Sequence, residues 1–344
     1  MIRLHFTRSN EEIDTEIDGL IERVGPVCCP ELVREMIIAA LKAGQESDSR
    51  ADLKLMNTTM KEMRITGKVF APYRKIRKVT VFGSARTRQD EPVYQMAVAF
   101  GRELAERGFM VITGGGGGIM EAANEGAGPD HSFGVNIRLP FEQKPNETLE
   151  GNPRLITYKY FFNRKVAFLK EACAIALFPG GFGTLDEAME SLTLMQTGKA
   201  NIIPLVLIDE PGGTYWTKWI RFFEDELFGE GYISKSDFSL FKRVDSIAAA
   251  IEHIVFFYRR FQSVRYVNGT LVIRMLTPLP EGAVNELAVR YSDMLLDGGK
   301  IQESGGLPAE ADEPDLAELP RLLVDFNRHD FGRLRSFIGA LNTY

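Results

Sequence analysis

The sequence predicts an α/β fold: a Rossmann-like, doubly wound parallel sheet with helices on both faces. The first observation is that short apolar runs alternate with segments of helical period between residues 79 and 261, as in chains of βαβ units. The second is that glycine clusters follow several of these apolar runs. Such turns bring helix N-termini to the carboxyl edge of a parallel sheet, where open α/β folds bind their ligands.

Two extensions flank this core, so the sequence predicts three parts. Residues 1–75 show charged, amphipathic periodicity and are predicted to form a helical N-terminal extension. Residues 76–262 hold the Rossmann-like nucleotide-binding core. Residues 263–344 are predicted to form a small α/β C-terminal extension with a β-hairpin, a helix, an acidic linker and a closing helix. The junction at 72–78 is basic, and we expect a solvated linker there rather than a nucleic-acid patch.

The individual elements follow from short apolar runs for strands and from apolar residues three and four positions apart for helices. In the N-terminal extension, helices are predicted at 11–24, 30–43 and 51–63. In the core, strands are predicted at 79–82, 109–113, 133–139, 155–160, 174–178 and 203–209. Core helices are predicted at 93–107, 119–126, 163–172, 185–198, 215–227 and 247–261. In the C-terminal extension, the expected elements are a hairpin at 265–273, a helix at 282–296, the acidic linker at 303–320 and the closing helix at 322–341.

The stretch Ala174–Gln196 carries the strongest local signal. Its first residues form an apolar run that Pro179 and two glycines end, which is typical of a buried parallel strand. Thr184 stands where a helix N-cap is expected, with Glu187 three residues later as its capping-box partner. A glycine turn before a helix N-terminus favours an anion, because the first amides of the helix have no internal partners. On these residues alone, Glu187 is either a capping residue or a catalytic carboxylate.

Composition narrows the class of protein. The chain has 344 residues, of which 44% are hydrophobic, and a net charge of −6. This hydrophobic content suits a globular protein with a sizeable core. The negative net charge does not suit a nucleic-acid binder, which usually carries an excess of basic residues. Cys28, Cys29 and Cys173 have no metal-site or disulfide spacing and fit a reducing compartment. We see no signal-peptide pattern or membrane-spanning stretch, and expect a cytoplasmic protein without membrane or nucleic-acid partners.

The spacing of the residues excludes three other kinds of functional motif. A dinucleotide fingerprint needs glycine at its first, third and sixth positions, but the sixth position after Gly114 is Ile119. No glycine loop runs into Gly-Lys-Ser or Gly-Lys-Thr, as a Walker motif requires. None of the four histidines precedes a lysine, as in the pyridoxal-binding motif of amino-acid decarboxylases. We therefore expect neither a metal nor an organic cofactor.

Three motifs together resemble one family. Pro179-Gly-Gly-Phe-Gly-Thr-Leu-Asp-Glu187 resembles the PGGxGTxxE signature of the LOG family, whose members are often labelled "lysine decarboxylase". Gly114–Asn124 is similar to that family's other glycine motif, and Phe162–Lys165 matches its Arg-Lys pair, in the expected order. The resemblance implies a phosphoribohydrolase, which cuts the N-glycosidic bond of nucleoside 5′-monophosphates, including cytokinin riboside monophosphates. It also implies a homodimer or a larger even-numbered homo-oligomer.

Glycosidic cleavage gives each motif a role. Breaking the bond between C1′ and the base builds oxocarbenium-like charge on the ribose, and Glu187 is expected to stabilise that charge or to activate the attacking water. The resemblance implies that Arg164 is also catalytic. Glu121 is expected either to contact ribose or base or to be a first-turn residue favoured by the helix dipole. The predicted substrate-binding residues are Gly83, Ser84, Gly114, Gly115, Gly116, Glu121, Lys165, Gly180, Gly181, Gly183 and Thr184.

The sequence therefore predicts a hydrolase that acts on AMP, or on a related or cytokinin riboside monophosphate, and releases free base and ribose 5-phosphate. Met120–Asn124 differs from the Leu-Met-Gly of shorter plant-type relatives, so the preferred base stays open. The alternative is a non-catalytic protein that binds or carries a nucleotide or the molybdenum cofactor, since molybdenum-cofactor carriers share this fold and similar glycine loops.

Overall fold

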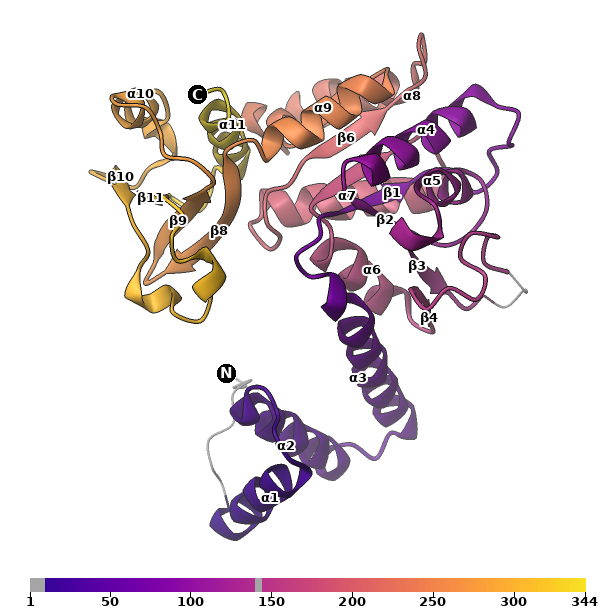
Figure 1. Cartoon of the computed structure of the whole chain (residues 1–344), viewed down its shortest axis with the longest axis vertical. Coiled ribbons are helices and arrows are strands. Elements are labelled where there is room, and N and C mark those ends of the chain that lie inside the picture. Colours follow the sequence, from indigo (N-terminus) through magenta and orange to yellow (C-terminus); the bar gives the residue numbers. More distant parts are fainter. Residues whose placement is uncertain (1–9, 140–143) are drawn as a thin grey trace. The chain divides into compact units, whose positions relative to one another are not determined.

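The computed structural model describes residues 10–139 and 144–344 (Figure 1). It divides into two compact units, one ending at Arg64 and one spanning Ile65–Tyr344. The helix Arg50–Phe70 crosses this division. The three-part organisation expected from the sequence, with limits at residues 75 and 262, stays a prediction.

The described part of the first unit is helical. Its elements are α1 (Glu11–Val24), α2 (Pro30–Glu46) and most of α3 (Arg50–Phe70), at or near the predicted positions. α1 begins where the Asn10 side chain accepts hydrogen bonds from the Glu12 and Ile13 amides, a local N-cap. Arg34 of α2 lies 3.0 Å from the Asp14 carboxylate of α1. This partly buried ion pair joins α1 to α2, and none of the side chains of α2 is itself fully buried.

A parallel sheet forms the centre of the second unit, which confirms the predicted fold class. The strands are ordered β4-β3-β2-β1-β5-β6-β7, and each pairs with its neighbour in parallel. They are β1 (Lys78–Phe82), β2 (Met110–Thr113), β3 (Ser132–Ile137), β4 (Leu155–Tyr158), β5 (Ala174–Leu177), β6 (Leu205–Ile208) and β7 (Lys242–Val244). The edge strand β7 was not predicted, because its three residues include two charged ones and show no apolar run.

Helices cover both faces of this sheet (Figure 1). They are α4 (Pro92–Glu106), α5 (Ile119–Ala127), α6 (Phe161–Lys170), α7 (Phe182–Gln196), α8 (Tyr215–Phe222) and α9 (Ile247–Phe257). Val79 and Val81 of β1 belong to the core cluster with α4, α5 and α9. The alternate residue Phe82 contacts Phe168 of α6 with ring centroids 4.8 Å apart. Because successive strand residues point to opposite faces, α6 covers the face opposite to that of α4.

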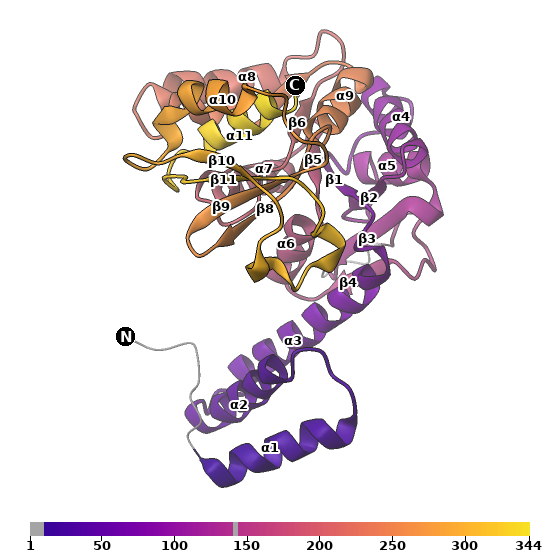
Figure 2. The ribbon, with the colours of Figure 1, turned by 60° about the vertical axis from the view of Figure 1, so that its left-hand side comes forward.

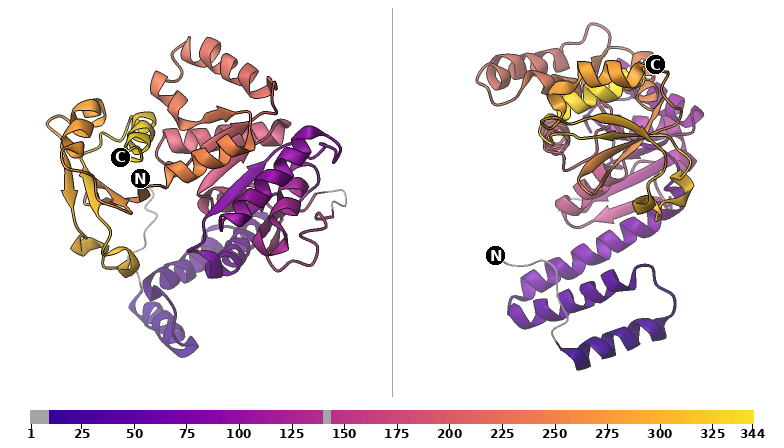
Figure 3. Two further views of the ribbon diagram at one scale, coloured as in Figure 1. Left: turned by 45° about the horizontal axis from the view of Figure 1, so that its top comes forward. Right: turned by 90° about the vertical axis from the view of Figure 1, so that its left-hand side faces the viewer.

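The C-terminal part forms a second, antiparallel sheet ordered β10-β11-β9-β8. Its elements are β8 (Phe261–Val267), β9 (Thr270–Met275), α10 (Ala283–Arg290), β10 (Ile301–Ser304), β11 (Arg321–Val324) and α11 (Phe331–Leu341). Figure 2 shows α10 and α11 on one side of this sheet, and Figure 3 (left) shows α11 between it and the main sheet. The predicted hairpin is confirmed, with positive φ at Asn268 (48°) and Gly269 (93°), as a type I′ turn requires.

Two predictions for the C-terminal part are wrong. The segment expected to be a loose acidic linker contains the end of β10 and two short 3-10 helices. The segment expected to be one closing helix begins with the strand β11, and its helix starts only at Phe331. The cause is a contact distant in sequence: Glu310 is buried between Arg274 of β9 and Arg321 of β11. The sequence pattern showed the carboxylates but not the arginines that neutralise them.

Candidate active site

The candidate site lies where the chain reverses its direction of progress through the sheet. From β1 the chain adds β2, β3 and β4 on one side, and then β5, β6 and β7 on the other. In open α/β sheets, ligands bind outside the carboxyl ends of the strands at such a switch point. Two backbone hydrogen bonds join the loops there: Ser84 N–H donates to Pro179 O, and Ile119 N–H donates to Ser84 O, both at 3.0 Å. The loops after β1, β2 and β5 thus form one surface.

Residue 180 must be glycine because the loops after β1 and β5 approach each other closely there. A Cβ atom there would lie 2.2 Å from Thr184 Oγ1 and 2.9 Å from Ser84 N. Gly83 is similarly confined, because its Cβ would lie 2.6 Å from the Ile119 side chain. These two positions therefore let the loops after β1 and β5 approach each other and the helix starts α5 and α7.

Helix α7 begins earlier than the sequence predicts. Its first residue is Phe182, and its N-cap is Gly181, which makes no side-chain capping bond. Thr184 is therefore the third residue of the helix, and its amide donates to Gly181 O at 3.0 Å. The predicted Thr184 N-cap and its capping box with Glu187 are wrong, because the glycines allow the helix to start before the first residue with a capping side chain. The interpretation of Glu187 as a capping residue is therefore wrong as well.

The start of α7 presents unpaired amide groups. Within the described residues, the N–H groups of Gly181, Phe182 and Gly183 have no acceptor. Positions 181 and 183 face open space, since a Cβ atom at either would meet nothing within 4 Å. Free amides and the positive end of the helix dipole together favour an anion.

A cavity of about 790 Å³ opens beside these amides. It brings together the predicted residues Gly83, Ser84, Gly114, Arg164, Gly180, Gly181, Gly183, Thr184 and Glu187. The other lining residues were not among the predicted site residues: Phe82, Ala85, Arg86, Met120, Phe168, Phe182 and Leu185. Of these, Arg86 adds a positive charge, and its place in the Gly83-Ser84-Ala85-Arg86 loop after β1 was the signal that could have identified it.

Four predicted residues do not line this cavity: Gly115, Gly116, Glu121 and Lys165. The backbone of Gly115 is already used, since its amide donates to Thr113 Oγ1 and its carbonyl accepts from the Asn146 amide, both at 2.9 Å. Gly116 O accepts from Asn146 Nδ2 at 3.1 Å. The second and third glycines of the run are therefore occupied in holding their own loop together.

Glu187 is a buried carboxylate beside two cations. Its side chain is 4% exposed, and burial raises its pKa to about 7, against the opposing effect of Lys165 and Arg164. Lys165 Nζ lies 3.9 Å from Glu187 Oε2 but closer to Asp186 and Glu190, at 2.8 and 2.7 Å. Lys165 is therefore shared among three carboxylates and does not neutralise Glu187 alone.

Arg164 is held by aromatic rings rather than by a carboxylate. Its guanidinium carbon lies 4.6 Å from the ring centroid of Phe161 and 5.5 Å from that of Phe168, and burial lowers its pKa. Within the described chain, neither Arg164 Nε nor Glu187 Oε2 has a hydrogen-bond partner. A buried polar atom left unpaired costs about 1–3 kcal/mol, so two such atoms in one cavity point to a role in binding or catalysis.

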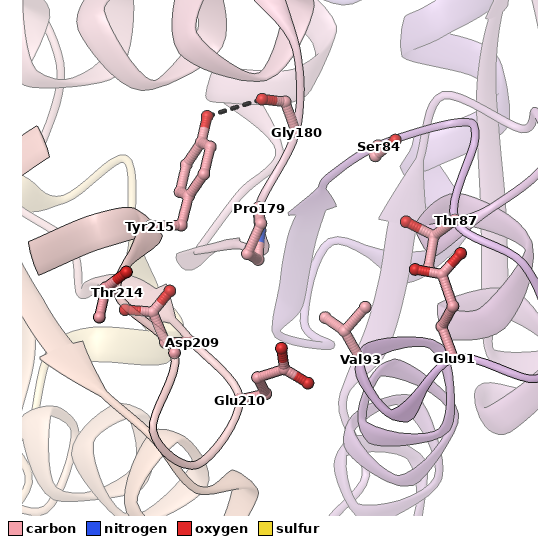
Figure 4. A pocket seen from close by; sticks show the side chains of 11 residues that line it. Ser84, Thr87, Glu91, Val93, Pro179, Gly180, Asp209, Glu210, Thr214 and Tyr215 are labelled. Carbon is pink, nitrogen blue, oxygen red and sulfur yellow. Dashed lines mark hydrogen bonds between the residues drawn. The ribbon is translucent and has the colours of Figure 1, made fainter. Parts of the chain in front are cut away.

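A second cavity, of about 370 Å³, lies on the other side of the Ser84 and Gly180 loops. Figure 4 shows Glu91, Asp209 and Glu210 around it. None of its described lining residues is a lysine or arginine, so its charge disfavours a phosphate group. Arg86 and Arg164 give the first cavity the opposite character.

Two further properties of the described chain bear on function. Over residues 10–139 and 144–344, histidine, cysteine and carboxylate side chains do not gather in threes as a metal site would require. Over the same residues, every helix is too short or too polar to cross a membrane.

The fold and this site define a doubly wound α/β protein with a buried carboxylate, a half-buried arginine and a glycine-lined helix start at the switch point. A family model described as "Possible lysine decarboxylase" matches residues 106–254. A probable cytokinin riboside 5′-monophosphate phosphoribohydrolase of Oryza sativa subsp. japonica is 30% identical over 176 residues, which are 50% of this chain and 73% of that protein. The chain belongs to the LOG family.

Two further proteins are similar to about half of the chain. A second probable cytokinin riboside 5′-monophosphate phosphoribohydrolase of Oryza sativa subsp. japonica is 32% identical over 166 residues, which are 46% of this chain and 64% of that protein. The solved structure of a molybdenum cofactor carrier protein from Chlamydomonas reinhardtii is 19% identical and covers 52% of this chain and 98% of its own, with a TM-score of 0.36.

Proposed function

We propose that this protein hydrolyses the N-glycosidic bond of a nucleoside 5′-monophosphate, AMP or a related or cytokinin riboside monophosphate, to free base and ribose 5-phosphate. The observation that carries the proposal is the Glu187 carboxylate oxygen that lacks a hydrogen-bond partner, in the same cavity as Arg164 and the free amides of α7. The phosphoribohydrolase names of its LOG relatives support the same reaction.

The 5′-phosphate binds at the start of α7. The amides of Gly181, Phe182 and Gly183 are the donors, and the helix dipole adds to their attraction for the anion. Arg86 lies on the same cavity wall and contributes a positive charge. A phosphate held there places the ribose inside the cavity that Glu187 lines.

Glu187 acts on the ribose. As the C1′–N bond breaks, its electron pair leaves with the base and positive charge develops on C1′ and the ring oxygen, which the carboxylate stabilises. Water then attacks C1′ and loses a proton to Glu187, and the base takes up a proton. With a pKa of about 7, the carboxylate is well matched to give and take a proton near neutral pH. The reaction uses water alone and needs no cofactor.

Arg164 orients the substrate and balances the charge of Glu187. The Phe161 and Phe168 rings fix its guanidinium plane while leaving Nε unpaired. Its pKa is lowered by burial but starts far above neutrality, so it stays a cation. It can therefore donate hydrogen bonds to a ribose hydroxyl or to phosphate.

A panel of nucleoside 5′-monophosphates tests the proposal, with release of free base and ribose 5-phosphate measured by chromatography. AMP and a cytokinin riboside monophosphate are expected to be hydrolysed, and adenosine is expected to be inert because it lacks the phosphate anchor. Equal turnover of adenosine and AMP would overturn the phosphate anchor. Tight AMP binding without base release from any member of the panel would instead favour the non-catalytic carrier.

A further inference from the structure

Tyr215 follows β6, but it contacts the loop after β5, which is the loop proposed to bind the phosphate. The residue is the first of α8, in the loop region after β6, and its hydroxyl donates to the backbone oxygen of Gly180 at 2.6 Å. Figure 4 shows this bond crossing from the loop after β6 to the loop after β5, with the tyrosine ring at the wall of the second cavity. Burial raises the pKa of Tyr215, so its hydroxyl is protonated and able to donate at neutral pH.

The position of Tyr215 is itself fixed by a buried ion pair. Asp209, at the end of β6, is 1% exposed. One of its oxygens lies 2.8 Å from Arg243 Nε of β7, and the other accepts from the Trp216 amide at 3.3 Å. Arg243 also donates to Gly213 O at 2.9 Å. The Asp209 and Arg243 side chains therefore hold the loop before Tyr215 and the start of α8 in place.

The Gly180 oxygen matters because of the geometry of the peptide bond. In a planar trans peptide, the C=O of one residue and the N–H of the next point in opposite directions. A hydrogen bond that holds the Gly180 oxygen toward Tyr215 therefore holds the Gly181 N–H away from it. Two consecutive glycines otherwise give this peptide unusual freedom to rotate.

We propose that Tyr215 is a positioning residue for phosphate: by holding the Gly180–Gly181 peptide, it aligns the amides at the start of α7 with the 5′-phosphate of the substrate. The inference rests on the proposed function for the identity of the substrate. It assigns the loop after β6 a part in recognising the phosphate, although Tyr215 touches neither phosphate nor the reacting atoms.

The substitution Tyr215→Phe tests this, because phenylalanine keeps the ring contact with Trp216, at 4.8 Å between centroids, and removes only the hydroxyl. Affinity for ribose 5-phosphate, measured by calorimetry, is expected to fall about fivefold, the factor that corresponds to one hydrogen bond. The KM for AMP is expected to rise by the same factor while kcat changes less than about twofold, since binding is affected in the ground and transition states alike. The exposed Tyr232→Phe serves as the matched control and is expected to change neither.

The outcomes separate the two proposals. Unchanged ribose 5-phosphate affinity in Tyr215→Phe, or no ribose 5-phosphate binding by the unaltered protein, overturns the positioning role. A lower unfolding temperature with unchanged affinity of the folded variant shows a structural bond only and also overturns it. Absence of AMP hydrolysis by the unaltered protein contradicts the proposed function alone, because the binding measurement does not depend on turnover.

Discussion

At the scale of single residues, Glu187 combines two properties that one substitution can separate. Its burial costs free energy whenever the carboxylate is ionised, and its charge is needed for the proposed reaction. Glu187→Gln is therefore expected to lower kcat by about a hundredfold or more, the scale of acid–base contributions. In the unaltered protein, the rate is expected to rise with pH through about 7, as the carboxylate ionises. Initial rates across that range check both expectations.

The same residue predicts a change in stability with pH. The folded pKa of about 7 lies above the ordinary value of 4.5, so the folded state holds more protons between these values and its stability falls as pH rises through them. Glu187→Gln is expected to remove this fall. Between pH 4 and a pH above 7, the stability of the variant relative to the unaltered protein is expected to rise by on the order of 3 kcal/mol.

Denaturant unfolding at several pH values measures the effect. Asp186→Asn is the comparison variant: this carboxylate is 60% exposed and is only a minor cause of the raised pKa of Glu187, so we expect the variant to keep most of the pH dependence. If Glu187→Gln keeps the full pH dependence of the unaltered protein, the elevated pKa of Glu187 is refuted.

At the scale of elements, a buried ion cluster holds the acidic segment between β10 and β11. Arg274 Nε lies 2.7 Å from Glu310 Oε1, and Arg321 Nε lies 3.1 Å from Glu310 Oε2. Burial alone would raise the pKa of Glu310, but its hydrogen bonds from Arg274 and Arg321 hold the pKa below the ordinary value. The carboxylate is therefore ionised at neutral pH and joins β9, β11 and the segment between β10 and β11.

Glu310→Gln is expected to destabilise the protein by about 3–5 kcal/mol, because it leaves the buried Arg321 guanidinium without its carboxylate and Arg274 with only the partly exposed Glu313. Chemical denaturation measures the change. Asp315→Asn is the matched control in the same segment: its pair with Lys75 is exposed, at 70% and 86%, and is expected to contribute less than about 1 kcal/mol. Equal losses for the two variants would show that burial of the cluster is not what stabilises the C-terminal sheet.

At the scale of the whole molecule, we propose that the protein is a homodimer or a larger even-numbered homo-oligomer. Helices α6 and α7 leave apolar side chains in solvent near the candidate site: Phe161, Phe162, Val166, Phe182 and Met189, each 41–93% exposed. Lys165 of α6 pairs with Asp186 and Glu190 of α7, so the two helices lie side by side. Grouped apolar side chains of this kind mark interaction surfaces, and a second copy of the chain is the occupant we propose.

Light scattering at micromolar concentration is expected to give at least twice the chain mass of 38.6 kDa. Val166→Asp combined with Met189→Asp is expected to shift the protein toward the monomer, because charges on this surface oppose its burial. Val289→Asp, at an exposed position of α10, is the control and is expected to leave the mass unchanged. A stable monomer for the unaltered protein would refute the assembly.

The sequence by itself determined the features that depend on neighbouring residues. Apolar runs and helical periods gave the parallel core, Asn268-Gly269 gave the hairpin, and the glycine motifs marked the loops at the carboxyl edge of the sheet. The motif residues Arg164 and Glu187 were also identifiable, because their spacing within Phe162–Lys165 and Pro179–Glu187 is a property of the chain alone.

Only the tertiary structure decided the features that depend on residues far apart in the chain. The burial that raises the pKa of Glu187, the charge of Arg86 in the cavity and the bond from Tyr215 to Gly180 all join different strand ends. The order of the acidic segment likewise depends on arginines of two other strands. Local patterns report which conformations a segment prefers, whereas desolvation and ion pairing depend on what packs against it, and folding alone brings those partners together.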